Sequence, residues 1–192
     1  MRRILKWLAI AIVGVALGLG SAALAVTQVV KRSGLHVGAW STPLDAGGAD
    51  RGFYTRAAVA VGALLALNRS ETIYFFADSD DEGRALDANC TYTLEGRDPA
   101  ARWWSITLYA GDHFLIENAQ NRWSYNGANV ARAADGRFHI KVAKAEQPGD
   151  WLPTGQAESL VLVVRLYNPA AEIAADPAKA ALPSISRGEC RS

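Results

Sequence analysis

The amino-acid sequence predicts a mainly β protein: an antiparallel β-sandwich, jelly-roll-like, with one packed α-helix and an N-terminal transmembrane helix. Three observations lead to this fold class. An uncharged apolar run extends from Trp7 to Val26. After Ser70 the apolar residues alternate with a period of two. Turn signals such as "DSDDEG", "GRDPA" and "QPGDWLPTG" separate short alternating segments, which favours antiparallel strands over βαβ units.

The apolar run predicts a membrane anchor over residues 1–26. At about 1.5 Å per helical residue it spans a hydrocarbon core of ~30 Å. Arg2, Arg3 and Lys6 precede it. We therefore expect the N-terminus in the cytoplasm, a single pass through the membrane, and the C-terminal domain exported to its other side. The segment "ALA" at residues 23–25 also fits a cleavage site, so a signal peptide is the alternative.

Small residues recur on one side of this predicted helix. Gly14 and Gly18 form a G-x-x-x-G pattern, and Ala22 follows one turn later. This spacing lets two helix backbones approach closely in lipid. A homodimer through Gly14 and Gly18 is therefore one expectation. The alternative is that the pattern only reflects the general abundance of small residues in membrane helices.

Residues 27–50 are expected to be a linker, because they are rich in glycine and small residues and have no sustained period. Trp40 is unusual there, and we expect it to pack onto the following domain, residues 51–192. A helix is predicted over residues 53–67, where the sequence is apolar on nearly every side. Seven strands are predicted after it, over residues 72–78, 90–96, 103–110, 114–118, 122–126, 138–145 and 159–167. The remaining tail is expected to be mostly irregular.

The two cysteines, Cys90 and Cys190, both follow the apolar run. An exported domain meets an oxidising compartment, where they can form a disulfide. Two free thiols are the alternative.

Composition argues against several classes of partner. The net charge is +1 and basic residues do not cluster, so no nucleic-acid partner is expected. The three histidines, His36, His113 and His139, lack ligand spacing, and no C-x-x-C occurs. We therefore expect no metal and no cofactor.

One acidic turn resembles the start of a calcium loop. Asp78, Asp80 and Glu82 precede Gly83, but the twelfth position is Asn89 instead of glutamate. A solvated hairpin turn is the main interpretation and calcium the alternative.

The strand over residues 103–110 predicts the clearest candidate site. Alternation places Trp104, Ile106, Leu108 and Ala110 on a core face, and Trp103, Ser105, Thr107 and Tyr109 on the other. Arg165 and Tyr167 belong to another strand and share one of its faces. A half-buried face under the helix or a loop is one interpretation. The other, a ligand groove, predicts a ligand-binding set of Trp103, Tyr109, Arg165 and Tyr167.

The charge of Arg165 requires compensation if the strand is buried. Asp112, Asp78 and Glu117 are the expected partners for a structural ion pair, and an anion-binding pocket is the alternative.

No catalytic residue is predicted. Asp112 and His113 lie in a turn, where aspartate usually accepts hydrogen bonds from nearby backbone amides. A dyad needs a third group, and no nucleophile motif supplies one. Trp151 in "DWLPTG" is expected to plug one end of the sandwich, with a sugar platform as the alternative.

Several motifs in order resemble a known family. They are "YFFADSDDEGRALDANCTYTLEG", "RWWSITLYAGDHFLIEN", "DWLPTG", "LVVRLYNP" and "LPSI". Together they resemble the domain of unknown function 1214 family of bacterial envelope proteins over most of residues 50–190. The resemblance implies a jelly-roll-like β-sandwich, which in longer relatives follows a second domain of unknown function. It also implies a bacterial cell, so the single pass is expected in the inner membrane and the C-terminal domain in the periplasm. It implies no reaction.

These observations favour a membrane-anchored periplasmic module that binds a small ligand or an envelope partner, or has a structural role. The alternative is an envelope hydrolase or carbohydrate-active enzyme whose site is assembled only in the fold. A pocket lined by Tyr109, Arg165 and an acidic residue would favour the enzyme.

Overall fold

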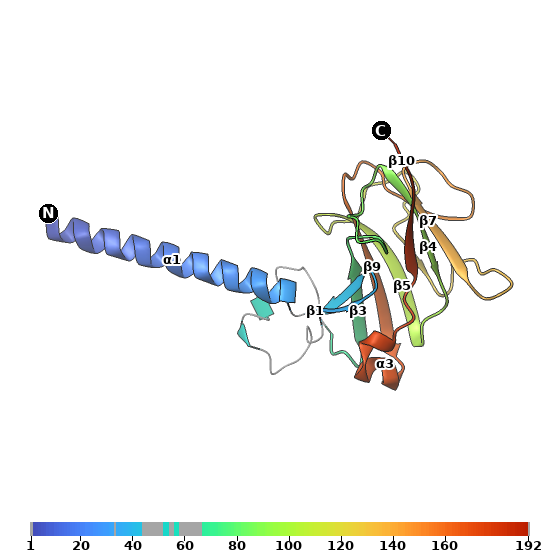
Figure 1. The fold of residues 1–192 in the computed structure, drawn as a ribbon, viewed down its shortest axis with the longest axis horizontal. Helices are drawn as coiled ribbons and strands as arrows, with labels where there is room; N and C mark the ends of the chain where they lie inside the picture. Colours follow the sequence, from blue (N-terminus) through green and yellow to red (C-terminus); the bar gives the residue numbers. More distant parts are fainter. Residues whose placement is uncertain (1, 33, 44–51, 54–55, 58–66, 192) are drawn as a thin grey trace. The chain divides into compact units, whose positions relative to one another are not determined.

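The computed structural model of the 192-residue chain describes residues 2–32, 34–43, 52–53, 56–57 and 67–191 (Figure 1). The chain divides into two compact units. One comprises Met1–Gly34 with Ala49–Leu65, and the other comprises Leu35–Gly48 with Ala66–Ser192.

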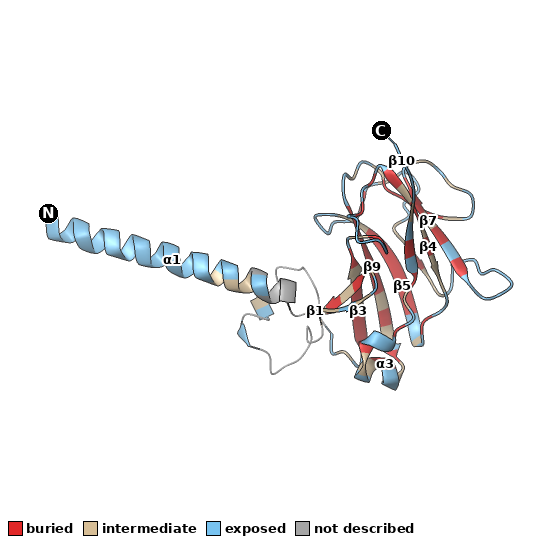
Figure 2. Cartoon of the chain, viewed as in Figure 1, coloured by how far each residue is buried: buried red, intermediate tan, exposed pale blue. Residues whose placement is uncertain are grey.

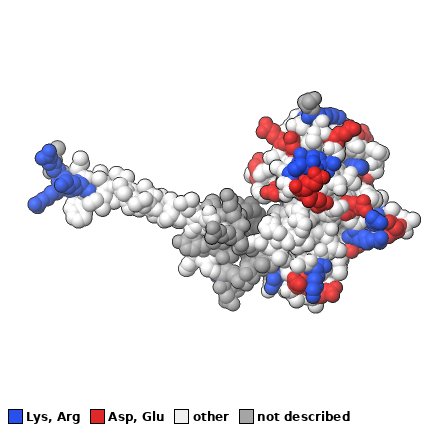
Figure 3. All heavy atoms as spheres, in the orientation of Figure 1, with Lys and Arg blue, Asp and Glu red and all other residues white. Residues whose placement is uncertain are grey.

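The first unit contains the helix α1, Arg2–Arg32. Its segment Arg2–Val26 is long and apolar enough to cross a membrane, and its large apolar side chains are exposed (Figure 2). Basic side chains gather at its N-terminal end, while the following turns are uncharged (Figure 3). The helix is therefore a candidate membrane anchor or signal sequence. It extends past residue 26 into the expected linker.

The second unit contains two β-sheets. The six-stranded sheet has the order β1-β2-β3-β9-β5-β6. Its strands are β1 (Gly34–Val37), β2 (Trp40–Pro43), β3 (Thr72–Ala77), β9 (Leu160–Pro169), β5 (Ala101–Ala110) and β6 (Ser124–Asn126). The central pairs β3–β9 and β9–β5 are antiparallel (Figure 1). Alternating apolar residues predicted these three long strands correctly.

The four-stranded sheet has the order β10-β4-β7-β8. Its strands are β10 (Ser184–Cys190), β4 (Cys90–Gly96), β7 (Phe138–Ala143) and β8 (Asp150–Pro153). The pair β7–β8 is parallel, which corrects the expectation of a purely antiparallel fold. The sequence around β8 was predicted to be a turn because it contains Pro148, Gly149 and Pro153. Pro153 is compatible with an edge strand, since β8 pairs on one side only.

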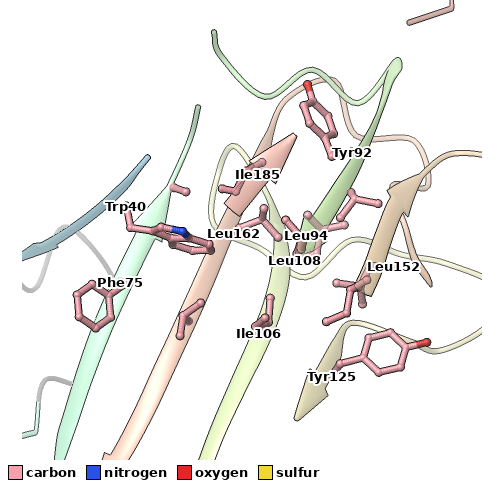
Figure 4. Packing of buried hydrophobic residues seen from close by; sticks show 14 of the residues in the cluster. Trp40, Phe75, Tyr92, Leu94, Ile106, Leu108, Tyr125, Leu152, Leu162 and Ile185 are labelled. Carbon is pink, nitrogen blue, oxygen red and sulfur yellow. The ribbon is translucent and has the colours of Figure 1, made fainter. Parts of the chain in front are cut away.

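One hydrophobic core joins the two sheets in a sandwich-like arrangement. Ile106 and Leu108 of β5 face the core together with Leu94 of β4 and Leu152 of β8 (Figure 4). Trp104 belongs to the same cluster, with 3% of its surface exposed. The predicted phase of strand β5 is therefore confirmed.

The strand predicted over residues 114–118 is wrong. Asp112 Oδ1 accepts a hydrogen bond from the Phe114 backbone N–H at 3.0 Å, and His113 has a φ of 66°. Leu115 forms only an isolated bridge with Tyr109. Phe114 remains 74% exposed, so the alternating pattern in this segment does not correspond to a buried face.

The expected linker over residues 27–50 carries structure. The end of α1 and the strands β1 and β2 fall within it. Trp40 is 2% exposed, and its Nε1 donates a hydrogen bond to the Pro183 carbonyl at 2.7 Å. The expected packing of Trp40 onto the domain is therefore confirmed. In the helix predicted over residues 53–67, Phe53, Arg56 and Ala57 are helical and Leu67 is not, and the rest lies outside the described residues.

The C-terminal tail is more regular than expected. It contains α3 (Ala171–Ala175), a short 3-10 helix η1 (Pro177–Lys179) and the strand β10. β10 pairs with β4, and Cys90 and Cys190 are register partners joined by a disulfide. The expectation of an irregular tail is therefore corrected: backbone pairing with β4 orders its last strand.

Candidate functional site

The outer face of the six-stranded sheet carries aromatic side chains around one arginine. Antiparallel register places Arg165 of β9 between Tyr74 of β3 and Ser105 of β5. The neighbouring row pairs Tyr167 with Trp103. Directly paired residues point to the same side of a sheet, so these side chains share a face. We call the set the aromatic face: Tyr74, Trp103, Thr107, Tyr109, Arg165 and Tyr167.

Arg165 lies at the centre of this face and is half-buried. One of its terminal nitrogens, Nη1, donates to Thr107 Oγ1 at 3.2 Å, and Nη2 donates to the Tyr109 hydroxyl at 2.8 Å. The guanidinium carbon also lies 5.8 Å from the ring centroid of Tyr74 and 5.5 Å from that of Tyr109. These distances fall within the range of a cation–π interaction. Neutral groups therefore hold the guanidinium in place.

The expected ion pair of Arg165 is not formed in the part of the chain that the structure describes. No salt bridge there joins it to Asp112, Asp78 or Glu117. The reason is register, because its neighbours on β3 and β5 are neutral residues. A pocket with an acidic residue beside Arg165 would have favoured an enzyme. Among the described residues, no acidic side chain forms a salt bridge with Arg165.

A second aromatic contact lies beside the arginine. The rings of Trp103 and Tyr167 meet edge to face, with centroids 5.1 Å apart and an interplanar angle of 63°. Trp103 remains 41% exposed. The structure thus brings the four predicted residues together as two contacting pairs, Trp103 with Tyr167 and Tyr109 with Arg165.

Tyr74 was missed from the sequence as a member of this site. Alternation in "TIYFFAD" separates it from Ile73 and Phe75, but only the register of β3 against β9 places it beside Arg165. Burial raises the pKa of Tyr74, Tyr167 raises it further, and Arg165 opposes both effects. The phenol is therefore neutral at pH 7 and does not cancel the arginine charge.

A family model for a "protein of unknown function (DUF1214)" matches residues 71–171, which include every strand of the aromatic face. The chain belongs to the DUF1214 family. The matched DUF1214 region runs from the residue before β3 to the start of α3 and contains the whole aromatic face. The resemblance noted in the sequence is confirmed.

Two solved structures are similar to this DUF1214 protein. The VPA0106 protein of Vibrio parahaemolyticus matches with a TM-score of 0.60 and 22% identity, over 71% of this chain and 35% of that chain. An uncharacterized protein from Burkholderia cenocepacia matches with a TM-score of 0.48 and 15% identity, over 92% of this chain and 43% of its own. The chain thus spans less than half the length of either. No curated protein matches it.

In the acidic turn of the DUF1214 region, the Asp80 carboxylate contacts two arginines and two backbone amides. Asp80 Oδ2 lies 2.9 Å from Nε of both Arg84 and Arg187. Its Oδ1 accepts hydrogen bonds from the backbone N–H groups of Glu82 and Arg84. Two arginines and two backbone amides thus contact the Asp80 carboxylate, which supports the interpretation as a structural hairpin turn.

The remaining candidates lie apart from one another. His36, His113 and His139 belong to β1, to the turn after β5 and to β7. Within the described ranges, no group of three or more His, Cys, Asp or Glu side chains is arranged to bind a metal. His113 instead meets the ring of Phe76 edge to face at 6.5 Å.

Trp151 is buried, and its Nε1 donates to the Ala143 carbonyl at 2.8 Å. Its ring is 4% exposed, but Trp151 does not belong to the core cluster that joins the two sheets, so its role as a plug stays a prediction. Beside it is an open hollow of about 410 Å³. The hollow's lining includes Glu117, Lys144 and Glu146, and none of the aromatic face.

Proposed function

We propose that this DUF1214 protein is a membrane-anchored periplasmic binding module, and that the aromatic face binds a small ligand. The observation that carries the proposal is the position of Arg165. A half-buried guanidinium is held by two hydroxyl groups and two aromatic rings, without a carboxylate partner among the described residues. Such a charge is costly to desolvate unless it is compensated.

The composition of the face supports binding. Ligand sites are mostly apolar and aromatic, with a few converging polar groups that fix orientation. Trp103 and Tyr167 supply the aromatic part, and Tyr109, Thr107 and Arg165 supply the polar part. All five belong to β5 and β9, two antiparallel strands paired over their whole length. Paired strands give a more fixed site than loops.

Two features support the anchored, exported location. The apolar helix α1 carries Arg2, Arg3 and Lys6 at its N-terminal end, the arrangement expected of a cytoplasmic end. The Cys90–Cys190 disulfide is typical of an oxidising compartment such as the periplasm.

A small-molecule screen tests the binding function. The full chain, purified in detergent micelles, is screened by thermal shift, and a true ligand raises the unfolding temperature saturably with its concentration. Hits are repeated on Trp103→Ala, and on Phe53→Ala as a control for loss of an exposed aromatic side chain. We expect Trp103→Ala to reduce the ligand-induced shift and Phe53→Ala to preserve it. Hits that both variants preserve would place binding elsewhere.

A further inference from the structure

We infer that the ligand of the aromatic face is an aryl carboxylate: a small organic monoanion whose carboxylate binds Arg165 and whose ring lies against Trp103 and Tyr167. This inference rests on the proposed binding function and specifies its ligand class. Charge, hydrogen-bonding capacity and spacing each support it.

The charge on the face is that of one guanidinium. Arg165 is the only cation among the six residues of the aromatic face, and the phenol of Tyr74 beside it is neutral. A carboxylate carries one negative charge and matches it, whereas a phosphate near its dianionic form carries more charge than one arginine neutralises. Planar guanidinium and carboxylate groups also match in geometry, since two parallel N–H···O bonds can form.

The guanidinium retains hydrogen-bonding capacity. Arginine has five N–H donors, and the structure gives two of them acceptors, on Thr107 and Tyr109. Within the described part of the chain the other donors of Arg165 have no protein acceptor. The Tyr109 hydroxyl accepts from Arg165 through a lone pair, so its own proton is available to a ligand oxygen.

The spacing of the two contacting pairs sets the length of the ligand. Arg165 and Tyr167 are two residues apart on β9, and residues two apart on a strand are separated by about 6–7 Å on the same face. A carboxylate joined to a ring by a short alkyl chain covers this distance. Phenylpropionate has this form, and its ring would meet the exposed part of Trp103.

Isothermal titration calorimetry on the full chain in detergent micelles tests this inference. The probes are phenylpropionate, its neutral amide, acetate and inorganic phosphate. We expect phenylpropionate to bind about tenfold or more tightly than the amide, because only the acid makes charge-assisted hydrogen bonds to Arg165. We expect acetate and phosphate to bind more weakly than phenylpropionate, since neither has a ring.

Two variants test whether the preference for phenylpropionate over its amide arises at the aromatic face. Arg165→Met should reduce the preference for acid over amide to about onefold, and Arg102→Met should retain it. Arg102 is a matched control, since it is exposed and belongs to the same strand, β5. If Arg165→Met fails to fold, the affinities of the unmodified chain for phenylpropionate and for its amide still show whether the site prefers a negative charge.

Three results would overturn the inference. In the first, the unmodified chain binds acid and amide equally, and Trp103→Ala loses the binding of both. The aromatic face would then be a binding surface for neutral ligands. Binding of phosphate more tightly than phenylpropionate would identify an anion site of a different class. Absence of binding by both acid and amide would reject aryl carboxylates, while hits from the screen that depend on Trp103 would still support the proposed function.

Discussion

Adjacent residues on one strand have opposite environments. Trp104 is stacked on Phe138 with ring centroids 5.0 Å apart, and its Nε1 donates to Asp98 Oδ1 at 3.1 Å. Trp104→Ala should lower the free energy of unfolding by ~3–5 kcal/mol, because it leaves a large cavity. Trp103→Ala should cost about 1 kcal/mol or less, because the Trp103 side chain is 41% exposed. Denaturant unfolding measures both, and equal losses would contradict the assigned faces.

Asp80 is a buried carboxylate that contacts two arginines. Burial by itself would raise the pKa of Asp80, but hydrogen bonds from the backbone and guanidinium of Arg84, together with its charge, outweigh burial and lower it. A depressed folded-state pKa means that the carboxylate contributes stability above its unfolded pKa, about 3.9. That contribution is lost as the pH falls through the folded-state value.

Asp80→Asn tests this linkage. The variant should lose about 1–3 kcal/mol of unfolding free energy at pH 7, because buried hydrogen-bond partners are left unsatisfied. It should also show a flatter decline in stability below about pH 4 than the unmodified chain. Urea unfolding across pH measures both effects, with Glu158→Gln as an exposed control. An unchanged acid decline in Asp80→Asn would show that other groups determine it.

At the scale of elements, the strand β10 depends on several attachments to the rest of the sandwich. The disulfide joins Cys190 to Cys90 of β4, and the Ile185 backbone N–H donates to Asp81 Oδ2 at 2.7 Å. Arg187 adds its ion pair with Asp80. These contacts connect the tail to both β4 and the acidic turn.

Removal of the disulfide should therefore weaken the fold without releasing all of β10. Cys90→Ser with Cys190→Ser should cost about 2–5 kcal/mol of unfolding free energy. Hydrogen exchange should increase most near Cys190 and least near Ile185, which keeps its contact with Asp81. Two alkylatable thiols in protein isolated from the periplasm would show that the disulfide does not form there.

The sequence predicted elements where burial imposes a pattern. The strands β3, β5 and β9 each contribute one face to the core cluster, and the period of two then assigns Trp103, Tyr109, Arg165 and Tyr167 to the opposite face. The middle parts of β5 and β9 are buried on both faces. The strands β1, β2, β8 and β10 are short or lie at sheet edges, so they carry little alternation. Tyr74 could not be assigned to the site because register is set by tertiary pairing.

For the whole molecule, the proposed topology has a direct genetic test. Because α1 carries basic residues at its N-terminal end, a C-terminal alkaline phosphatase fusion should be active and a green fluorescent protein fusion should be dark. The reverse pattern would contradict the proposed periplasmic location. Mass spectrometry of the mature N-terminus distinguishes an anchor, which keeps α1, from a signal peptide cleaved near residue 25.

The central claim is that the aromatic face around Arg165 is the ligand-binding site. A crystal structure of the chain with a small molecule that saturably stabilises it tests this claim most directly. We expect ligand density in contact with the Arg165 guanidinium and the rings of Trp103 and Tyr167. Density in the hollow beside Glu117 and Glu146, with the aromatic face empty, would contradict it.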